Sequence, residues 1–252
     1  MKKIILLLLI STIWLNAFAQ SESSSFTANS PAEPDNEISY IEKHKLAIPK
    51  KIFRRKDYSH YQEDLLDKYQ SNKNFLKQAL LPSLIALSYY PELQNTKIRF
   101  IYADTKTSLA ARPRFWSLFR GRENRTYNIF IDKKVKQQEG VLFEDFPFNA
   151  QLGGIGHEYA HIIDYSERSG LNILWLGVKY LFSKKARAKL EHKVDKITIE
   201  RGLGWQAIAW EEHVLKHSTA SNKYKIYKKK VYLSTEQIKD HMNQCPVYGG
   251  SL

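Results

Sequence analysis

The run from Gly156 to His161 constrains this chain more than any other feature, because it contains the pattern H-E-x-x-H. In a helix, residues four positions apart project from one face, so both histidines could bind a single Zn²⁺. Glu158 falls beside that face, where its carboxylate can deprotonate a water molecule that the metal polarises. The glycines at 153, 154 and 156 lower helix propensity by about 1 kcal/mol each relative to Ala, so we expect close packing against a neighbouring element.

Flanking residues predict the limits of this helix. The run Phe146-Pro147-Phe148-Asn149 is typical of an extended approach that ends in a helix N-cap, with Asn149 as the cap residue. The apolar pattern continues to Tyr165 and is interrupted over Ser166–Gly170. A plainer interpretation is an ordinary core helix that carries two hydrogen-bonded histidines.

A catalytic zinc site needs a third protein ligand. Thirty residues after His161, Glu191 and Asp195 lie one helical turn apart within Ser183–Gly202, which has helical apolar spacing. Ser183 is placed to cap this helix and Gly202 to end it. Glu191 could supply the third ligand, and Asp195 could accept a hydrogen bond from the second nitrogen of a ligating histidine. The alternative is a solvated helix face with routine charges.

These motifs resemble the gluzincin division of the zincin metallopeptidases, in which H-E-x-x-H is joined by a glutamate from a later E-x-x-x-D helix. The resemblance covers about residues 127–210. It implies an α+β fold, mostly helical, with a small sheet whose edge strand borders the active-site cleft. The roles that it implies are zinc ligands His157, His161 and Glu191, a general base and proton shuttle Glu158, and an orienting residue Asp195.

Several other residues compete for a place at the site. A metzincin continuation is excluded, because Asp164 and Glu167 stand where that longer motif needs Gly and His. Asp164 could approach the metal, although backbone or solvent contacts at the helix end are favoured. His192 points about 100° away from Glu191 on a helix. An oxyanion could be stabilised by His213, by His217 or by one of the fifteen tyrosines.

The N-terminal residues predict export. Residues 1–19 combine Lys2 and Lys3 with an apolar stretch and an Ala17-Phe18-Ala19 cleavage site, as in a signal peptide. An uncleaved N-terminal anchor is the alternative. We therefore expect a periplasmic or secreted protein without a transmembrane helix after signal removal. Residues 20–36 predict a flexible linker, and residues 37–252 a single domain.

The chain is basic, with a net charge of +13, which becomes +11 when the two lysines of the leader are removed. The segment Asn222–Lys230 interleaves lysines with tyrosines and could bind an anionic envelope polymer or a lipid surface. Export argues against nucleic acid as a partner. The plainer interpretation is a solvated strand or loop that aids solubility. Cys245 is the only cysteine, so no disulfide forms within the chain, and its role stays open.

Further elements follow from periodicity. Tyr61–Tyr90 predicts a helix kinked or divided at Pro82, and Lys97–Tyr102 and Arg125–Ile131 predict strands. Because Tyr127–Asp132 is the strand candidate immediately before the metal helix, we expect it to be the edge strand that binds an extended substrate. Ala111–Asn124 is either a loop overhanging the cleft and favouring acidic substrates or a hairpin connection with inward-facing aromatics.

The last third of the chain predicts three more helices. Leu171–Phe182 is apolar but too short to span a bilayer, so a buried helix is expected, with lipid contact as the alternative. Helices are also expected over Trp205–Lys216 and Ser234–Asn243, the second with a capped start.

Taken as a whole, the sequence predicts an exported zinc-dependent metallopeptidase acting on a peptide or protein substrate. One alternative is a non-catalytic, metal-containing binding protein of the cell envelope that uses its basic surface. Another is a peripheral membrane component that uses Leu171–Phe182.

Overall fold

The computed structural model describes residues 47–105, 107–133 and 141–249, all of which belong to one compact unit, Ala32–Leu252. The predicted leader and the predicted linker lie outside the described residues. In the described part of the chain, no helix has both the length and the apolar character needed to cross a bilayer.

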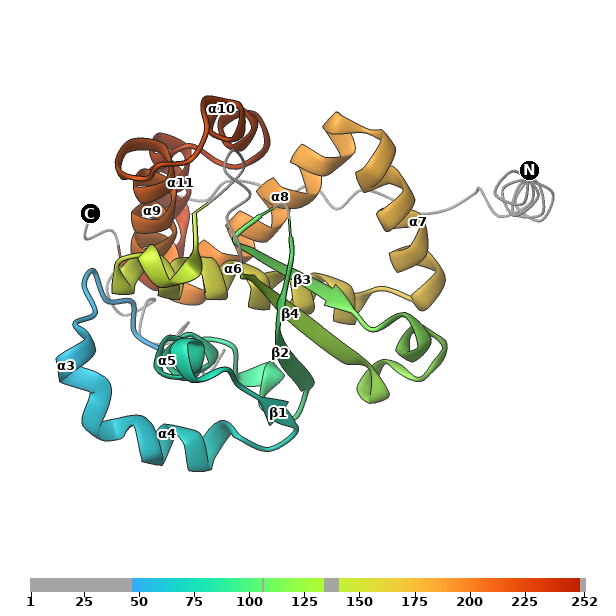
Figure 1. The fold of residues 1–252 in the computed structure, drawn as a ribbon, viewed down its shortest axis with the longest axis horizontal. Coiled ribbons are helices and arrows are strands. Elements are labelled where there is room, and N and C mark those ends of the chain that lie inside the picture. The colour runs from blue at the N-terminus through green and yellow to red at the C-terminus, as the bar shows by residue number, and fades with distance from the viewer. Residues whose placement is uncertain (1–46, 106, 134–140, 250–252) are drawn as a thin grey trace. The chain divides into compact units, whose positions relative to one another are not determined.

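The fold is α+β, with many helices and one small sheet (Figure 1). The strands are β1 (Lys73–Asn74), β2 (Lys97–Ala103), β3 (Leu109–Pro113) and β4 (Thr126–Asp132). The α-helices are α3 (Arg55–Tyr58), α4 (Gln62–Tyr69), α5 (Leu80–Leu87), α6 (Phe148–Glu167), α7 (Gly170–Phe182), α8 (Lys184–Thr198), α9 (Gly204–Glu212), α10 (Asn222–Val231) and α11 (Thr235–Gln244). Short 3₁₀ turns include η4 (Phe115–Phe119), and π-helical turns η7 (Ile199–Leu203) and η8 (His213–His217) follow α8 and α9.

The sheet has the strand order β1-β2-β4-β3. β1 pairs with β2 and β2 with β4 in parallel, whereas β3 runs antiparallel to β4. The predicted strands β2 and β4 are confirmed, and alternate residues of β4, such as Tyr127 and Ile129, are buried. The prediction that Tyr127–Asp132 is the edge strand is wrong, because β4 pairs on both sides and β3 occupies the edge.

The predicted helix Tyr61–Tyr90 is divided, but not at Pro82. Helix α4 ends at Tyr69, and the short strand β1 and a 3₁₀ turn separate it from α5. Pro82 lies in the first turn of α5, where a backbone N–H has no partner within the helix, so the proline is accommodated without a kink. The chain therefore turns where β1 joins the sheet.

Helix α6 lies at the centre of the molecule, between the sheet and α9, and residues 150–164 are all buried. A Cβ at Gly153 would fall on the backbone carbonyl of Gln206 in α9, so the predicted close packing is confirmed. The predicted N-cap is wrong. Pro147 occupies that position, while the Asn149 side chain accepts from the Phe53 N–H and donates to its carbonyl, at 2.9 Å each.

The predicted second helix of the site is confirmed as α8. The Ser183 hydroxyl caps it by accepting from the Ala186 N–H at 3.1 Å. Gly202 has a φ of 91°, a conformation that favours glycine, and it marks the bend between α8 and α9.

Helix α7 forms where a helix is expected, but it is not buried. In this 13-residue helix only Ile173 is buried, and large apolar side chains such as Trp175 and Phe182 face solvent. Burial fails because α7 packs on one side only, against α8 and η4.

The C-terminal helices form a second, smaller core around Met242 and Val247. The predicted cap of α11 is confirmed, with Ser234 and Gln237 forming a reciprocal capping box. Cys245 is a free, buried thiol of this core, and burial raises its pKa to about 11. Neither a reactive nor a metal-binding role fits such a thiol.

Candidate metal centre

Helix α6 presents His157 and His161 on one face, as the four-residue spacing predicts. Their rings are 4.8 Å apart between centroids and nearly perpendicular. Both side chains are buried, so they share an environment largely shielded from water. The glycine-rich packing of α6 against α9 explains this depth, because the helix backbones approach closely where side chains are absent.

Glu191, on α8, reaches the same point from the opposite side. Its Oε2 lies 3.1 Å from His157 Nε2 and 3.2 Å from His161 Nε2. One ligand atom from each of the three buried residues lies within 4.8 Å of the others. The structure therefore brings the three predicted ligands together in a cluster that could hold a metal ion.

Asp195 lies one turn along α8 and holds the first histidine in place. Its Oδ1 is 2.9 Å from His157 Nδ1, and its Oδ2 accepts from the Leu233 N–H at 2.9 Å. A neutral His157 whose Nδ1 donates to Asp195 keeps its lone pair on Nε2, where a metal ion would replace the proton otherwise shared with Glu191. Asp195 thus makes the contact that an orienting residue requires.

The electrostatics of the cluster favour a cation. Burial alone would lower the pKa of His157, but hydrogen bonds with Asp195 and Glu191 outweigh it and raise the pKa to about 10. Burial would raise the pKa of Glu191, yet the two imidazoles lower it. Two buried carboxylates that stabilise positive charge on imidazole would likewise stabilise a divalent ion at the point where the donor atoms meet.

The donor set fits a zinc ion. Imidazole nitrogen and carboxylate oxygen are ligand types that Zn²⁺ accepts, and three protein ligands leave a fourth position open. His161 Nδ1 is buried and has no hydrogen-bond partner in the described part of the chain, so no contact there fixes the tautomer of this ring. The residues present therefore match the group that the sequence motif implies.

Glu158 lies beside the two histidines and is also buried. Its Oε2 accepts a hydrogen bond from the Ala111 N–H of β3. Burial raises the pKa of Glu158 against the opposing effect of the two imidazoles, so its carboxylate has a greater affinity for a proton than an exposed one. A carboxylate with this property is suited to general-base chemistry.

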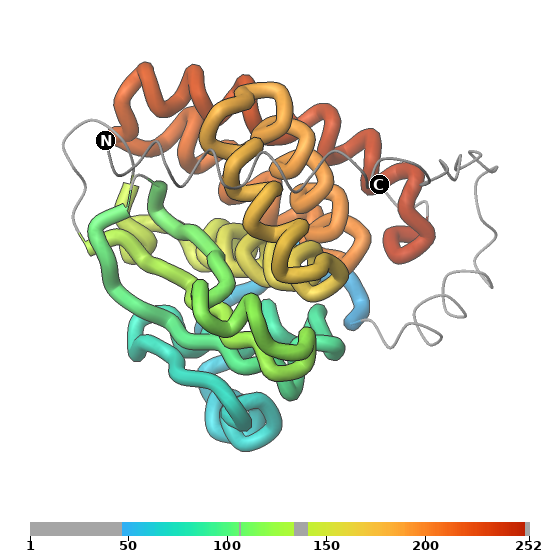
Figure 2. The backbone as a smooth tube through the Cα atoms, turned by 90° about the vertical axis from the view of Figure 1, so that its right-hand side faces the viewer, coloured from blue at the N-terminus to red at the C-terminus, as the bar shows by residue number. Residues whose placement is uncertain are grey.

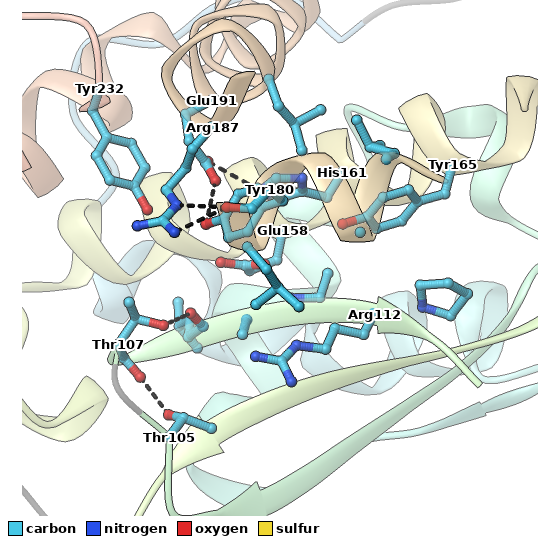
Figure 3. A pocket seen from close by; sticks show the side chains of 18 of the residues that line it. Thr105, Thr107, Arg112, Glu158, His161, Tyr165, Tyr180, Arg187, Glu191 and Tyr232 are labelled. Carbon is cyan, nitrogen blue, oxygen red and sulfur yellow. Dashed lines mark hydrogen bonds and ion pairs between the residues drawn. The ribbon is translucent and has the colours of Figure 1, made fainter. Parts of the chain in front are cut away.

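A cavity of about 840 Å³ opens onto Glu158, His161 and Glu191 (Figure 3). Residues 109–113 of β3 form one wall, and α7, α8 and α10 contribute the others. Figure 3 shows Glu158 and His161 between the helix that carries Glu191 and the strand that carries Arg112. The strand that borders the cleft is thus β3, which forms one of the two edges of the sheet.

Sequence reasoning missed the tyrosines that surround the cluster. The Tyr180 hydroxyl donates to Glu191 Oε1 at 2.8 Å, and the Tyr165 ring stacks on His161 with centroids 5.8 Å apart. Tyr232 lies 5.5 Å from the His157 ring and lines the cavity. None of them belongs to a recognisable motif, and with fifteen tyrosines in the chain no spacing singles them out.

The competing ligands do not reach the cluster. The buried Asp164 side chain binds Arg168 and Lys193 at 2.7–2.8 Å, so side chains, not backbone or solvent, hold it. His192 is partly exposed and lies outside the cluster. The His213 ring packs against Phe146, and neither His213 nor His217 lines the cavity. If an oxyanion is stabilised by a side chain, the cavity tyrosines are better placed.

The basic segment Asn222–Lys230 is helix α10, not the strand or loop expected. Tyr224 and Lys228 are buried within it, so the segment is no continuous basic patch. Lys228 Nζ lies 3.4 Å from the Trp210 ring centroid and 4.1 Å from that of Tyr232. Burial lowers the pKa of Lys228 to about 8, although nearby carboxylates including Asp195 oppose this.

The loop Ala111–Asn124 matches neither expectation fully. Arg112 lines the cavity from β3, whereas Phe115, Trp116 and Phe119 face solvent in η4 instead of folding inward.

Comparisons with protein-family models, with curated proteins and with solved structures find no match. The functional assignment therefore depends on the geometry of this site.

Proposed function

We propose that this chain is an exported zinc-dependent metallopeptidase with a zincin-like fold. The observation that carries the proposal is the convergence of His157, His161 and Glu191 around one point, with Glu158 adjacent and a cavity opening onto it. Zinc held by these three residues would polarise a scissile carbonyl and activate a water molecule.

In the proposed reaction, Glu158 accepts a proton from the attacking water on a carboxylate oxygen and then donates it to the leaving amine. The hydrogen bond from the Ala111 N–H holds this carboxylate in place, and the raised pKa of Glu158 favours proton uptake. Asp195 holds the His157 ring with Nε2 directed toward the ligand cluster. Tyr180 holds the Glu191 carboxylate in the same way from the other side.

The edge strand β3 suggests how a polypeptide would bind. β3 pairs with β4 on one side only and lies along the cavity, so an extended substrate could add to the sheet through backbone hydrogen bonds. Side-chain pockets would then select the sequence. Arg112 and the cavity tyrosines would favour acidic or aromatic residues beside the scissile bond.

The alternative function, a metal-containing envelope protein that only binds a partner, does not account for Glu158. A binding site has no need of a buried, unligated carboxylate beside two metal ligands, since burying such a group is costly. A peptidase needs a base there. Catalysis therefore explains why the Glu158 carboxylate is buried, and binding alone does not.

The decisive experiment compares Glu158→Gln with the wild type. Zinc content by atomic mass spectrometry and cleavage of an unstructured peptide library would be measured together. We expect about one zinc per chain in both proteins, with turnover lowered at least 10²-fold in the variant, as is typical of losing a general base. Glu167→Gln is the matched control, since this exposed residue ends the same helix.

Three results would contradict the proposal. Retained turnover in Glu158→Gln would exclude this base, and absence of zinc from the wild type would exclude the metal. A wild type that holds zinc but cleaves no peptide in the library would favour the binding protein.

A further inference from the structure

Large apolar side chains are exposed over η4 and α7, on one side of the molecule. In the described residues, twelve large hydrophobic side chains are exposed, and eight of them belong to these two elements. We call these eight the apolar face: Phe115, Trp116, Phe119, Leu171, Trp175, Val178, Leu181 and Phe182. Trp116 is 72% exposed and Phe182 83%, so these are whole side chains in water.

The apolar face is continuous. The start of α7 packs on η4 so closely that a Cβ at Gly170 would fall on the carbonyl of Leu118. Within η4 the rings of Phe115 and Phe119 are 5.7 Å apart, which forms one aromatic cluster. Figure 2 shows α7 and the turn before β4 on the side of the molecule that faces the viewer.

Helix α7 is apolar on two sides. Leu171, Trp175, Val178 and Phe182 recur at the spacing of one helix stripe, which faces outward. The opposite side, including Ile173, lines the cavity. A soluble surface helix would carry polar residues on its outer stripe. The outward stripe therefore calls for a partner.

Basic residues are concentrated in the two segments that carry the apolar face. Residues 112–123 and 170–189 contain one acidic residue, Glu123, against nine basic ones. The nine are Arg112, Arg114, Arg120, Arg122, Lys179, Lys184, Lys185, Arg187 and Lys189, and all except Arg187 are exposed. Lys179 Nζ lies 5.3 Å from the centroid of the Trp175 ring, which places a cation beside the apolar stripe.

We propose that the apolar face docks on the anionic surface of a lipid bilayer. Exposed Trp, Phe and Leu flanked by Lys and Arg match both the apolar zone and the negative charge of such a surface. The 13 residues of α7 span about 20 Å, too short to cross the hydrocarbon core but suited to lying in the interface. A protein partner is a poorer fit, because protein interfaces contain few lysines and require a surface of complementary shape. A lipid surface tolerates lysines and does not require a complementary shape.

Docking has a consequence for the cavity. Leu181 belongs to the apolar face and also lines the cavity, and Leu176 and Gly177 line it from the same helix. The bilayer would therefore lie next to the cavity wall that α7 forms. This consequence rests on the proposed peptidase function: polypeptide segments close to the membrane surface would reach the cavity most readily.

The test is co-sedimentation of the chain from Gln20 onward with vesicles. Omitting residues 1–19 removes an apolar stretch that would itself bind lipid and leaves the unit Ala32–Leu252 whole. Vesicles of phosphatidylcholine mixed with phosphatidylglycerol would be compared with phosphatidylcholine alone. We expect preferential binding to the anionic vesicles, weakened as salt is raised.

Paired variants locate the binding surface. The double changes Trp175→Ser with Phe182→Ser, and Lys184→Glu with Lys185→Glu, should each lower the partition coefficient by about tenfold or more. The matched controls are Ile52→Ser with Ile226→Ser, and Lys229→Glu with Lys230→Glu, which change exposed residues outside the apolar face. The controls should bind as the wild type does. Circular dichroism would verify that every variant is folded.

The proposal is overturned if the wild type does not prefer anionic vesicles, or if the apolar variant binds them undiminished. Equal loss in the α10 control would mean that net charge alone drives binding. A concentration-dependent dimer of the wild type that the apolar variant abolishes, without any effect on vesicle binding, would assign the face to a second copy of the chain instead.

Discussion

Helices α6 and α7 follow each other in the chain, yet one is buried and the other is exposed. Fifteen of the 20 residues of α6 are buried, including His157, Glu158 and His161, whereas only Ile173 is buried in α7. The more polar helix is inside because each of its buried charges has partners, and because its glycines admit α9 closely. The more apolar helix is outside because it packs on one side only.

This contrast teaches that composition alone does not determine burial. An apolar helix is expected inside a protein, and a helix with charged residues outside. Helix α6 is an exception because a metal centre, as proposed there, needs buried charge. Helix α7 is an exception because a docking surface, as proposed there, needs exposed apolar side chains. The exceptions to the burial rule therefore point to the two places where this chain is proposed to act.

The largest expected effect concerns the buried helix α6 and the metal cluster that it shares with α8. Glu191→Ala should lower zinc affinity by at least about 100-fold, because it removes a ligand, a change more severe than the loss of an orienting contact. Affinity would be measured by competition with a chromophoric chelator. Glu167→Ala, at the exposed end of α6, is the control and should leave affinity unchanged. Wild-type affinity in Glu191→Ala would mean that the cluster is not the metal site.

A smaller effect on the free energy of unfolding is expected when glycine is replaced by alanine in each of the two helices. In α6, Gly153→Ala would drive a methyl group into the Gln206 carbonyl, and we expect the free energy of unfolding to fall by about 2 kcal/mol or more. In α7, a Cβ at Gly177 meets nothing within 4 Å. Gly177→Ala should therefore stabilise the fold by about 0.5–1 kcal/mol through helix propensity.

Urea unfolding of the two glycine variants, followed by circular dichroism, measures both free energies. The informative quantity is the sign: the same change should destabilise one helix and stabilise its neighbour. Two changes of the same sign would show that the close approach of α6 and α9 does not limit side-chain size.

Local signals in the sequence account for much of the fold and the site. The strands β2 and β4, the Ser183 and Ser234 caps, and the common face of His157 and His161 all follow from patterns within single elements, whereas Glu191 was expected as their partner from the resemblance to gluzincins. In each case a short-range rule, such as side-chain alternation or helix periodicity, fixes the geometry.

The features that could not be predicted depend on long-range packing. β3 has only five residues and ends at Pro113, so its place at the sheet edge comes from pairing with β4 and from the hydrogen bond to Glu158. Tyr180 reaches Glu191 because α7 packs on α8, which no spacing encodes. The exposure of α7 is likewise a property of its neighbours, not of its own sequence.

The last expected effect concerns another buried charge of α6, Asp164, of which α7 has no equivalent. Its carboxylate binds Arg168 and Lys193, and Asp164→Asn should lower the free energy of unfolding at neutral pH by about 2 kcal/mol, as expected for hydrogen bonds to a charged group. Both partners remain partly exposed, so water can solvate them in the variant, and the loss stays below that of a fully buried pair.

The pH dependence gives this prediction its sign. Burial would raise the pKa of Asp164, but the bonds to Arg168 and Lys193 outweigh burial and lower it in the folded state. The stabilisation is therefore complete above the unfolded pKa of about 4 and disappears as the pH falls through the lowered folded value. The difference between wild type and Asp164→Asn should shrink from pH 7 toward pH 3 in urea unfolding, whereas that for the exposed Asp240→Asn should stay near zero throughout. A difference that grows on acidification would mean that the carboxylate is buried at a net cost, and that α6 does not gain stability from its charges.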